Sequence, residues 1–134
     1  METKIVNKTF SNAEIKEKII SLQPLLSLRD IIGYAAARNA RVLSDAITEY
    51  EQFEREAILK YGTPDLDSDG NPIGTTSISQ YSESFEKFAK EIDPLRSIEQ
   101  ELPIMVVDYE KVIGTLSGEE ILVTDWMFQD IEEG

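Results

Sequence analysis

The strongest pattern in the sequence is a helical stripe of apolar residues that recurs every three or four positions between residues 43 and 61. Charged residues fill the positions between them, as in a helix with one face in a core and the other in water. A second stripe, at residues 78–92, has the same spacing over two heptads. Gly62 and Pro64 end the first helix. The pattern predicts an antiparallel helical hairpin over about residues 28–92, with an apolar face made of Leu43, Ala46, Ile47, Tyr50, Phe53, Ala57, Ile58, Tyr61, Ile78, Tyr81, Phe85, Phe88 and Ile92.

Three short segments have the composition of a capping box, in which a serine precedes an acidic residue by three positions. They span residues 11–14, 27–30 and 117–120, and each predicts the start of a helix. The first helix should end near Pro24, and the second should open the long helix. Gly33 leaves open whether that long helix is continuous or bends. The third helix should run through Ile121, Leu122, Trp126 and Met127.

Two segments favour extended structure. Residues 3–10 alternate loosely between polar and apolar side chains, and residues 102–107 form a β-rich apolar run that is too short for a helix. Residues 112–116 are expected to continue the extended structure, and the tail at residues 129–134 to fray. A small sheet of the first two segments is compatible with this pattern. The sequence therefore predicts a mostly helical α+β fold in a single domain, residues 1–134, with a C-terminal strand and helix within residues 102–128.

Composition narrows the chemistry of this 134-residue chain. It contains no cysteine and no histidine, which excludes disulfides, thiolate sites and the usual general base near neutral pH. The net charge is −13, and acidity increases along the chain. This disfavours nucleic acid and anionic membranes as partners and favours a basic protein surface. The N-terminus lacks the apolar segment of a secretory signal, so a cytoplasmic location is expected.

One acidic segment resembles a metal-binding loop. Asp65, Asp67 and Asp69 occupy positions one, three and five of a calcium-binding EF-hand loop, with Gly70 at position six. Position twelve is Thr76, however, where the loop requires a bidentate glutamate. The same residues also form a strong polar turn. The three carboxylates are a candidate weak Ca²⁺ site, and no other cofactor is predicted.

Three consecutive large apolar residues, Trp126, Met127 and Phe128, cannot all face one side of a short helix. Either they pack on the sheet of the domain itself or at least one binds a partner. They are the candidate partner-binding residues.

Several segments together resemble a family of small phage and prophage proteins of unknown function from Gram-positive bacteria. The resemblance covers residues 38–128. It implies a phage-encoded accessory protein that acts in the cytoplasm of the host bacterium, and a place in the virion stays open. The matching segments are Ala57-Ile58-Leu59-Lys60-Tyr61-Gly62, Asp67-Ser68-Asp69-Gly70-Asn71-Pro72-Ile73, Phe85-Glu86-Lys87-Phe88, Glu101-Leu102-Pro103-Ile104 and Leu116-Ser117-Gly118-Glu119-Glu120-Ile121-Leu122.

The function expected from these features is non-enzymatic, because the sequence contains no catalytic motif. The protein should act through contacts with a phage or host protein, either in assembly or on a host target. One alternative is an acidic inhibitor that mimics nucleic acid on a host defence or transcription protein. Another is a weak calcium-binding protein or a carboxylate-dependent enzyme. Self-association is a further alternative, because the first part of the long helix has no predicted partner.

Overall fold

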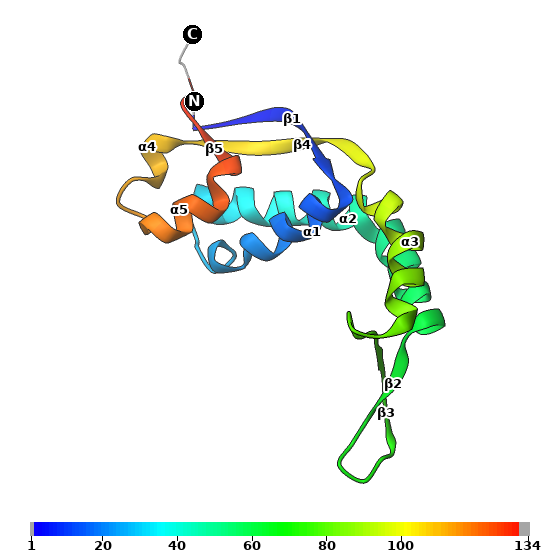
Figure 1. Ribbon diagram of the computed structural model, residues 1–134. Coiled ribbons are helices and arrows are strands. Elements are labelled where there is room, and N and C mark those ends of the chain that lie inside the picture. Colours follow the sequence, from blue (N-terminus) through cyan, green and yellow to red (C-terminus); the bar gives the residue numbers. More distant parts are fainter. Residues whose placement is uncertain (1, 132–134) are drawn as a thin grey trace. The chain divides into compact units, whose positions relative to one another are not determined.

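The computed structural model describes residues 2–131 and has the α+β fold class that the sequence predicts (Figure 1). Its contacts divide the chain into two compact units. Unit 1 comprises the residues up to Ile47 and those from Glu99 onward, and unit 2 comprises Thr48–Ile98. In chain order the elements are β1 (Thr3–Ser11), α1 (Asn12–Ser21), the 3₁₀ helix η1 (Gln23–Leu25), α2 (Ile31–Tyr61), β2 (Thr63–Leu66), β3 (Pro72–Ser77), α3 (Glu83–Arg96), β4 (Glu99–Asp108), α4 (Tyr109–Val112), α5 (Gly118–Thr124), the 3₁₀ helix η2 (Asp125–Met127) and β5 (Phe128–Gln129).

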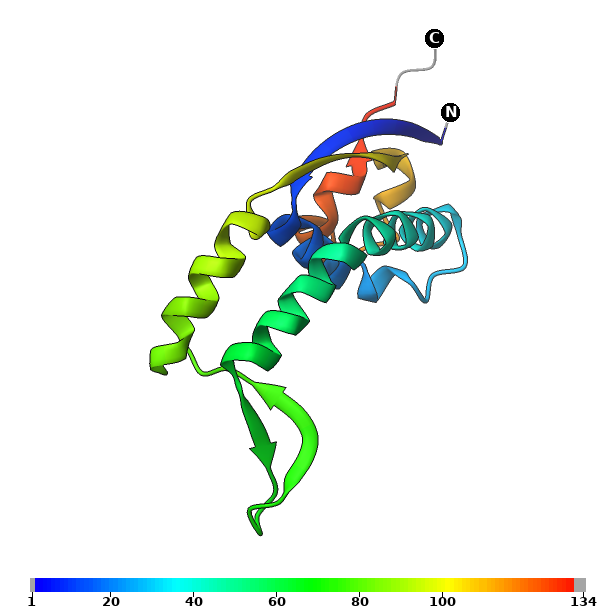
Figure 2. The same cartoon turned by 90° about the vertical axis from the view of Figure 1, so that its right-hand side faces the viewer.

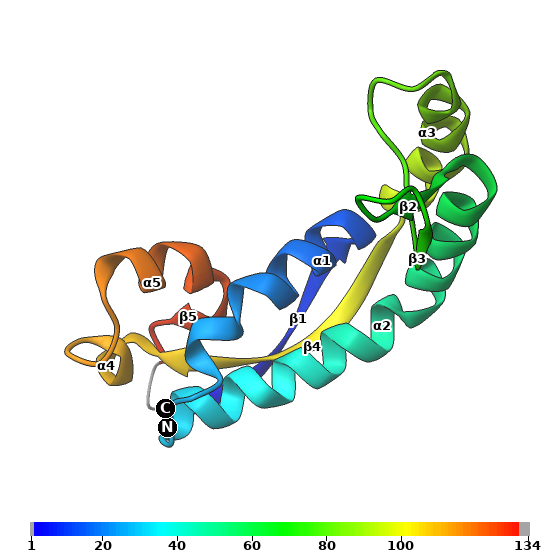
Figure 3. The same ribbon diagram turned by 90° about the horizontal axis from the view of Figure 1, so that it is seen from below.

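Unit 1 is built on a three-stranded sheet of order β1-β4-β5. β1 and β4 are antiparallel over nine residue pairs, from Thr3 opposite Val107 to Ser11 opposite Glu99, and β5 adds two parallel pairs. Helices α1 and α5 and the first part of α2 lie on one side of β1 and β4 (Figures 1 and 3). Because strand residues alternate between faces, every second residue of β4 contributes to the core on that side. The buried members are Leu102, Ile104 and Val106.

A buried amide ties α2 to the sheet. The side chain of Asn39 is fully buried; its Nδ2 donates to the carbonyl oxygen of Met105 at 2.9 Å, and its Oδ1 accepts from the Met105 backbone N–H at 2.8 Å. The amide therefore binds β4 as a neighbouring strand would, on the edge of β4 away from β1. A buried polar side chain is tolerated here because both of its hydrogen-bonding groups have partners.

Unit 2 contains α2 from Thr48 onward, the β2–β3 hairpin and α3. Within this unit α3 lies alongside the last turns of α2, and the hairpin connects the two helices (Figure 2). The hairpin pairs Thr63 with Ser77 and Leu66 with Pro72, and its register shifts between Pro64 and Leu66. Its residues are mostly exposed.

Many local predictions are confirmed. Residues 11–14 and 117–120 are capping boxes with both reciprocal hydrogen bonds, and they start α1 and α5. α2 is a single helix from Ile31, so it is continuous through Gly33 and ends before Gly62. The predicted strands at residues 3–10 and 102–107 lie within β1 and β4 and pair with each other.

Other local predictions are wrong. Asp30, and not the Ser27 box, caps α2, because its carboxylate accepts from the N–H groups of Ile32 and Gly33. Residues 62–76, predicted only as a connection between the two helices, contain the paired strands β2 and β3, and the predicted polar turn lies between these strands at residues 67–71. Residues 109–112 form α4, a short helix capped by Asp108, so the predicted extended segment 112–116 is absent.

The predicted helical hairpin over residues 28–92 is not confirmed at its full length. The part of α2 before Thr48 belongs to unit 1, and α3 begins only at Glu83 and continues past Pro94 to Arg96. Tyr81 therefore lies outside the helix and is 89% exposed, and Phe53 is 52% exposed although its stripe predicts burial. The single-domain organisation stays a prediction. In the tail, β5 takes Phe128 and Gln129, and residues 132–134 lie outside the described residues.

Candidate protein-binding groove

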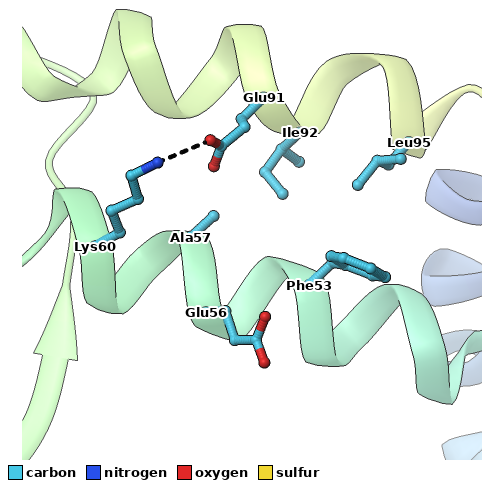
Figure 4. Close-up of a pocket in the computed structure, with 7 residues that line it drawn as sticks. All are labelled: Phe53, Glu56, Ala57, Lys60, Glu91, Ile92 and Leu95. Atoms are coloured by element: carbon cyan, nitrogen blue, oxygen red, sulfur yellow. Dashed lines mark hydrogen bonds and ion pairs between the residues drawn. The ribbon is translucent and has the colours of Figure 1, made fainter.

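Unit 2 contains a groove between the end of α2 and α3, with a volume of about 430 Å³ (Figure 4). This volume is within the range of ligand-binding clefts. The groove exists because Ala57, a small residue, faces Ile92 across the helix pair, so the two helices meet without filling the space between them. Both side chains are buried and form an apolar floor. The lining residues are Phe53, Glu56, Ala57, Lys60, Glu91, Ile92 and Leu95.

Phe53 and Leu95 form the apolar end of the groove (Figure 4). Leu95 is half-buried, but Phe53 keeps 52% of its surface exposed. Complete burial of a phenylalanine is worth about 1.5–3 kcal/mol, so the exposed half of this ring can still contribute roughly 1 kcal/mol to binding. Phe53 is therefore the side chain of this groove that gains most from a bound apolar group.

The opposite end of the groove is polar. Lys60 of α2 and Glu91 of α3 form an ion pair of 3.1 Å, and the Tyr61 hydroxyl donates to the same carboxylate at 3.2 Å. Contact with Tyr61, and then with Glu91, raises the pKa of Lys60 above its ordinary value. An exposed pair of this kind contributes little to stability. Its effect is to fix where the charged end of the groove lies.

Tyr50 is a buried tyrosine of the same helix. Its hydroxyl donates to the carboxylate of Glu54 at 2.7 Å. Burial, followed by this hydrogen bond, raises the pKa of Tyr50 above its ordinary value, so the phenol stays neutral at physiological pH.

Taken together, the residues that line the groove offer an apolar floor, one exposed aromatic ring and a charged rim. These are the groups that recognise an amphipathic side-chain surface.

Two of the three aspartates of the candidate calcium site have other partners. Asp65 accepts hydrogen bonds from the hydroxyls of Thr75 at 2.8 Å and Ser77 at 2.5 Å, and these bonds lower its pKa, with Ser77 as the larger cause. Asp67 accepts from the backbone N–H groups of residues 69 and 71, so it organises the turn itself. Within residues 2–131 the structure brings no three acidic side chains together in a group that could hold a metal ion. A Ca²⁺ site at these residues stays a prediction.

The candidate partner-binding residues lie in unit 1. Met127 and Phe128 are buried in its core. Trp126 is half-buried, with its ring edge-on to Phe10 at 5.9 Å and its indole N–H donating to Ser21 Oγ at 3.3 Å. Packing within unit 1 accounts for Met127 and Phe128, and a partner-binding role for Trp126 stays a prediction. Burial leaves Met127 and Phe128 little surface for a partner.

An exposed apolar surface does occur next to them, on α5. Leu122 is 81% exposed and Val123 is also exposed; with Pro24 they line a shallow depression of about 510 Å³, edged by Glu119 and Glu120. The argument made from the sequence for Trp126, Met127 and Phe128 applies to this helix as well. Ile121, Leu122 and Val123 are also three consecutive apolar residues on a seven-residue helix, so some of them have to face solvent.

Comparisons with family models, curated proteins and solved structures find no match to the chain. Between residues 2 and 131, no helix is both long and apolar enough to cross a membrane.

Proposed function

We propose that this protein is a non-enzymatic binding protein that acts through protein–protein contacts, with the unit 2 groove as its docking surface. The observation that supports this most directly is the half-exposed Phe53 beside an apolar floor between two helices. A groove between two helices suits a third, amphipathic helix that lays its apolar face along it. The role as a phage or prophage accessory protein, directed at a phage or host partner, rests on the sequence resemblance.

The charge of unit 2 identifies the kind of helix that would bind. Residues 48–98 carry eleven acidic and five basic side chains. Glu56 lines the groove, and the exposed Glu49 lies about one helical turn before Phe53. The partner helix should therefore carry an aliphatic anchor that contacts Phe53 and Leu95, with lysine or arginine on either side of the anchor. A second copy of this chain is a poorer occupant, because it carries the same net charge of −13.

The test uses a synthetic helical peptide with leucine on one face and lysine on the other, titrated into the protein and followed by amide chemical shifts. We expect the largest shifts at the end of α2 and in α3. Phe53→Ala should weaken binding at least tenfold, because truncation of a central aromatic anchor typically removes 2 kcal/mol or more, and about 1.4 kcal/mol corresponds to a factor of ten. Tyr81→Ala is the matched control, since Tyr81 is an exposed aromatic residue of the same unit that does not line the groove.

Two further measurements separate this proposal from its rivals. A photo-crosslinking amino acid at position 53 should capture a basic helical segment of a different protein; capture of another copy of this chain would assign the groove to self-association. Binding that vanishes at high salt and does not respond to Phe53→Ala would indicate contact through charge alone, as expected for a nucleic-acid mimic. Either outcome overturns the groove as an apolar docking surface.

A further inference from the structure

The free edge of the unit 1 sheet is the outer edge of β1, and the register of the sheet shows which backbone groups it presents. Met105 exchanges its backbone hydrogen bonds with Asn39 and not with β1, and its strand partner is Ile5. Pro103, which has no N–H, is opposite Asn7. In an antiparallel pair, hydrogen-bonded and non-hydrogen-bonded positions alternate. The odd-numbered residues of β1 therefore direct their N–H and C=O groups away from β4.

The two sides of the sheet are treated differently. Beyond β4, the Asn39 amide pairs with Met105 and β5 pairs with Val107 and Asp108, while Pro103 has no N–H to satisfy. Beyond β1, no strand among the described residues pairs with the chain. Four consecutive outward-directed positions, at residues 3, 5, 7 and 9, thus present four donors and four acceptors. An unpaired edge of this kind is a template for another strand.

The edge carries few of the features that usually protect such strands. β1 runs for nine residues opposite β4 without a bulge and contains no proline. Its charged residues are Lys4 and Lys8, on the same face of the strand. Lys8 is turned toward the protein, since its ammonium donates to the backbone carbonyl of Trp126 at 2.8 Å, and burial lowers its pKa. The outward-directed positions themselves are uncharged: Thr3, Ile5, Asn7 and Thr9.

We propose that the outer edge of β1 binds an extended acidic segment of a partner protein by strand addition. Backbone hydrogen bonds to the four outward-directed positions would supply the contact. Charge identifies the segment: Lys4 and Lys8 flank the edge, Lys18 lies close to Phe10 at the end of β1, and residues 1–41 carry seven basic and four acidic side chains. Asp125 acts on Lys8, which leaves Lys4 the more available of the two lysines, and salt screens carboxylates that lie beyond about 8 Å at physiological ionic strength.

A second copy of the chain is the main competing occupant. It would present the same basic strand, and registers that place Lys4 opposite Lys8 bring like charges together, which destabilises a strand pair. The incoming segment should instead carry its acidic residues beside Lys4 and Lys8. Glu101 is opposite Thr9, so the end of the edge near Thr9 is less suited to acidic residues of the incoming segment.

The experiment uses Ile5→Pro, because the N–H of Ile5 points away from β4 and its loss breaks no bond of the sheet. Proline is accepted at such edge positions, as Pro103 already shows on β4. The probe is an eight-residue peptide that alternates valine and glutamate. We expect it to slow hydrogen exchange at the N–H groups of residues 3, 5, 7 and 9 at least tenfold, and we expect Ile5→Pro to weaken its binding at least tenfold. Ile5→Thr, which keeps the N–H, should bind as the wild type does.

Three results would overturn the proposal: equal binding of a valine–lysine peptide, peptide binding that Ile5→Pro leaves unchanged, or a wild-type dimer that Ile5→Pro converts to a monomer. The last result would assign the edge to a second copy. If Ile5→Pro lowers the stability of unit 1, measured by Trp126 fluorescence, the wild-type protein is tested instead with a peptide that is N-methylated at alternate residues. That peptide should lose binding for the same reason, and retained binding counts against strand addition.

Discussion

Replacement of Asn39 by alanine is the most direct test of how unit 1 holds its sheet on α2. The buried amide makes two hydrogen bonds to the backbone of Met105, at 2.9 and 2.8 Å. No other described strand pairs with β4 at this residue, since β5 pairs only with Val107 and Asp108. Truncation therefore leaves a donor and an acceptor of the β4 backbone without a partner.

The magnitude follows from the cost of the two groups left unpaired. An unsatisfied buried donor or acceptor costs about 1–3 kcal/mol, and a small cavity adds to this. Met105 itself is only half-buried, so we expect Asn39→Ala to lower the free energy of unfolding of unit 1 by about 3 kcal/mol. Asn39→Asp should be at least as harmful at neutral pH, because a carboxylate offers no donor to the Met105 carbonyl. Acidification should recover part of that loss, since the protonated acid can donate again.

The assay is urea unfolding followed by the fluorescence of Trp126, which is the single tryptophan of the chain and lies in unit 1. Asn7→Ala is the control, because Asn7 is exposed on β1 and its substitution should change the free energy of unfolding by less than about 0.5 kcal/mol. A loss below about 1 kcal/mol for Asn39→Ala, or an equal loss for both variants, would refute the role assigned to the buried amide.

Three further predictions concern local geometry and pH. Gly33→Ala should destabilise unit 1 by about 2–3 kcal/mol in the same assay, because the added Cβ would lie 1.9 Å from the Leu28 carbonyl oxygen. The Ser11 capping box lowers the pKa of Glu14, so the ionised Glu14 carboxylate stabilises α1 at pH values above the usual glutamate pKa. This stabilisation is lost as the pH falls through the lowered pKa. Glu14→Gln should remove this dependence from unfolding measured at neutral and acid pH. Hydroxyl donors likewise lower the pKa of Asp65, so acid should lower the amide protection factors in β2–β3, and Asp65→Asn should abolish that response.

The sequence determined the features that depend on neighbouring residues. Serine–glutamate boxes mark the starts of α1 and α5, because the two reciprocal hydrogen bonds join residues three positions apart. Gly62 marks the end of α2, and short β-rich runs mark β1 and β4. The helical spacing of the α2 stripe also placed Phe53 and Ala57 close to one face, which is part of the candidate groove.

Tertiary structure decided which of these faces are covered. Phe53 and Leu43 satisfy the same apolar spacing, yet Leu43 is buried in unit 1 while Phe53 lines an open groove in unit 2. The reason is that α3 begins only at Glu83 and meets α2 across the small Ala57, which the periodicity does not encode. Trp126 likewise is packed by Phe10 and Ser21, which are more than one hundred positions away in the chain.

The free edge of β1 shows the same division. The sequence indicates that residues 3–10 are extended, because alternation is a property of neighbouring residues. Which edge of the strand is left open depends on its pairing with β4, and on Asn39 and β5 completing the other side of the sheet. Asn39, β4 and β5 come from distant segments, and β5 lies at the opposite end of the chain from β1. Their positions are set by packing of the whole unit, and only the folded structure brings them together.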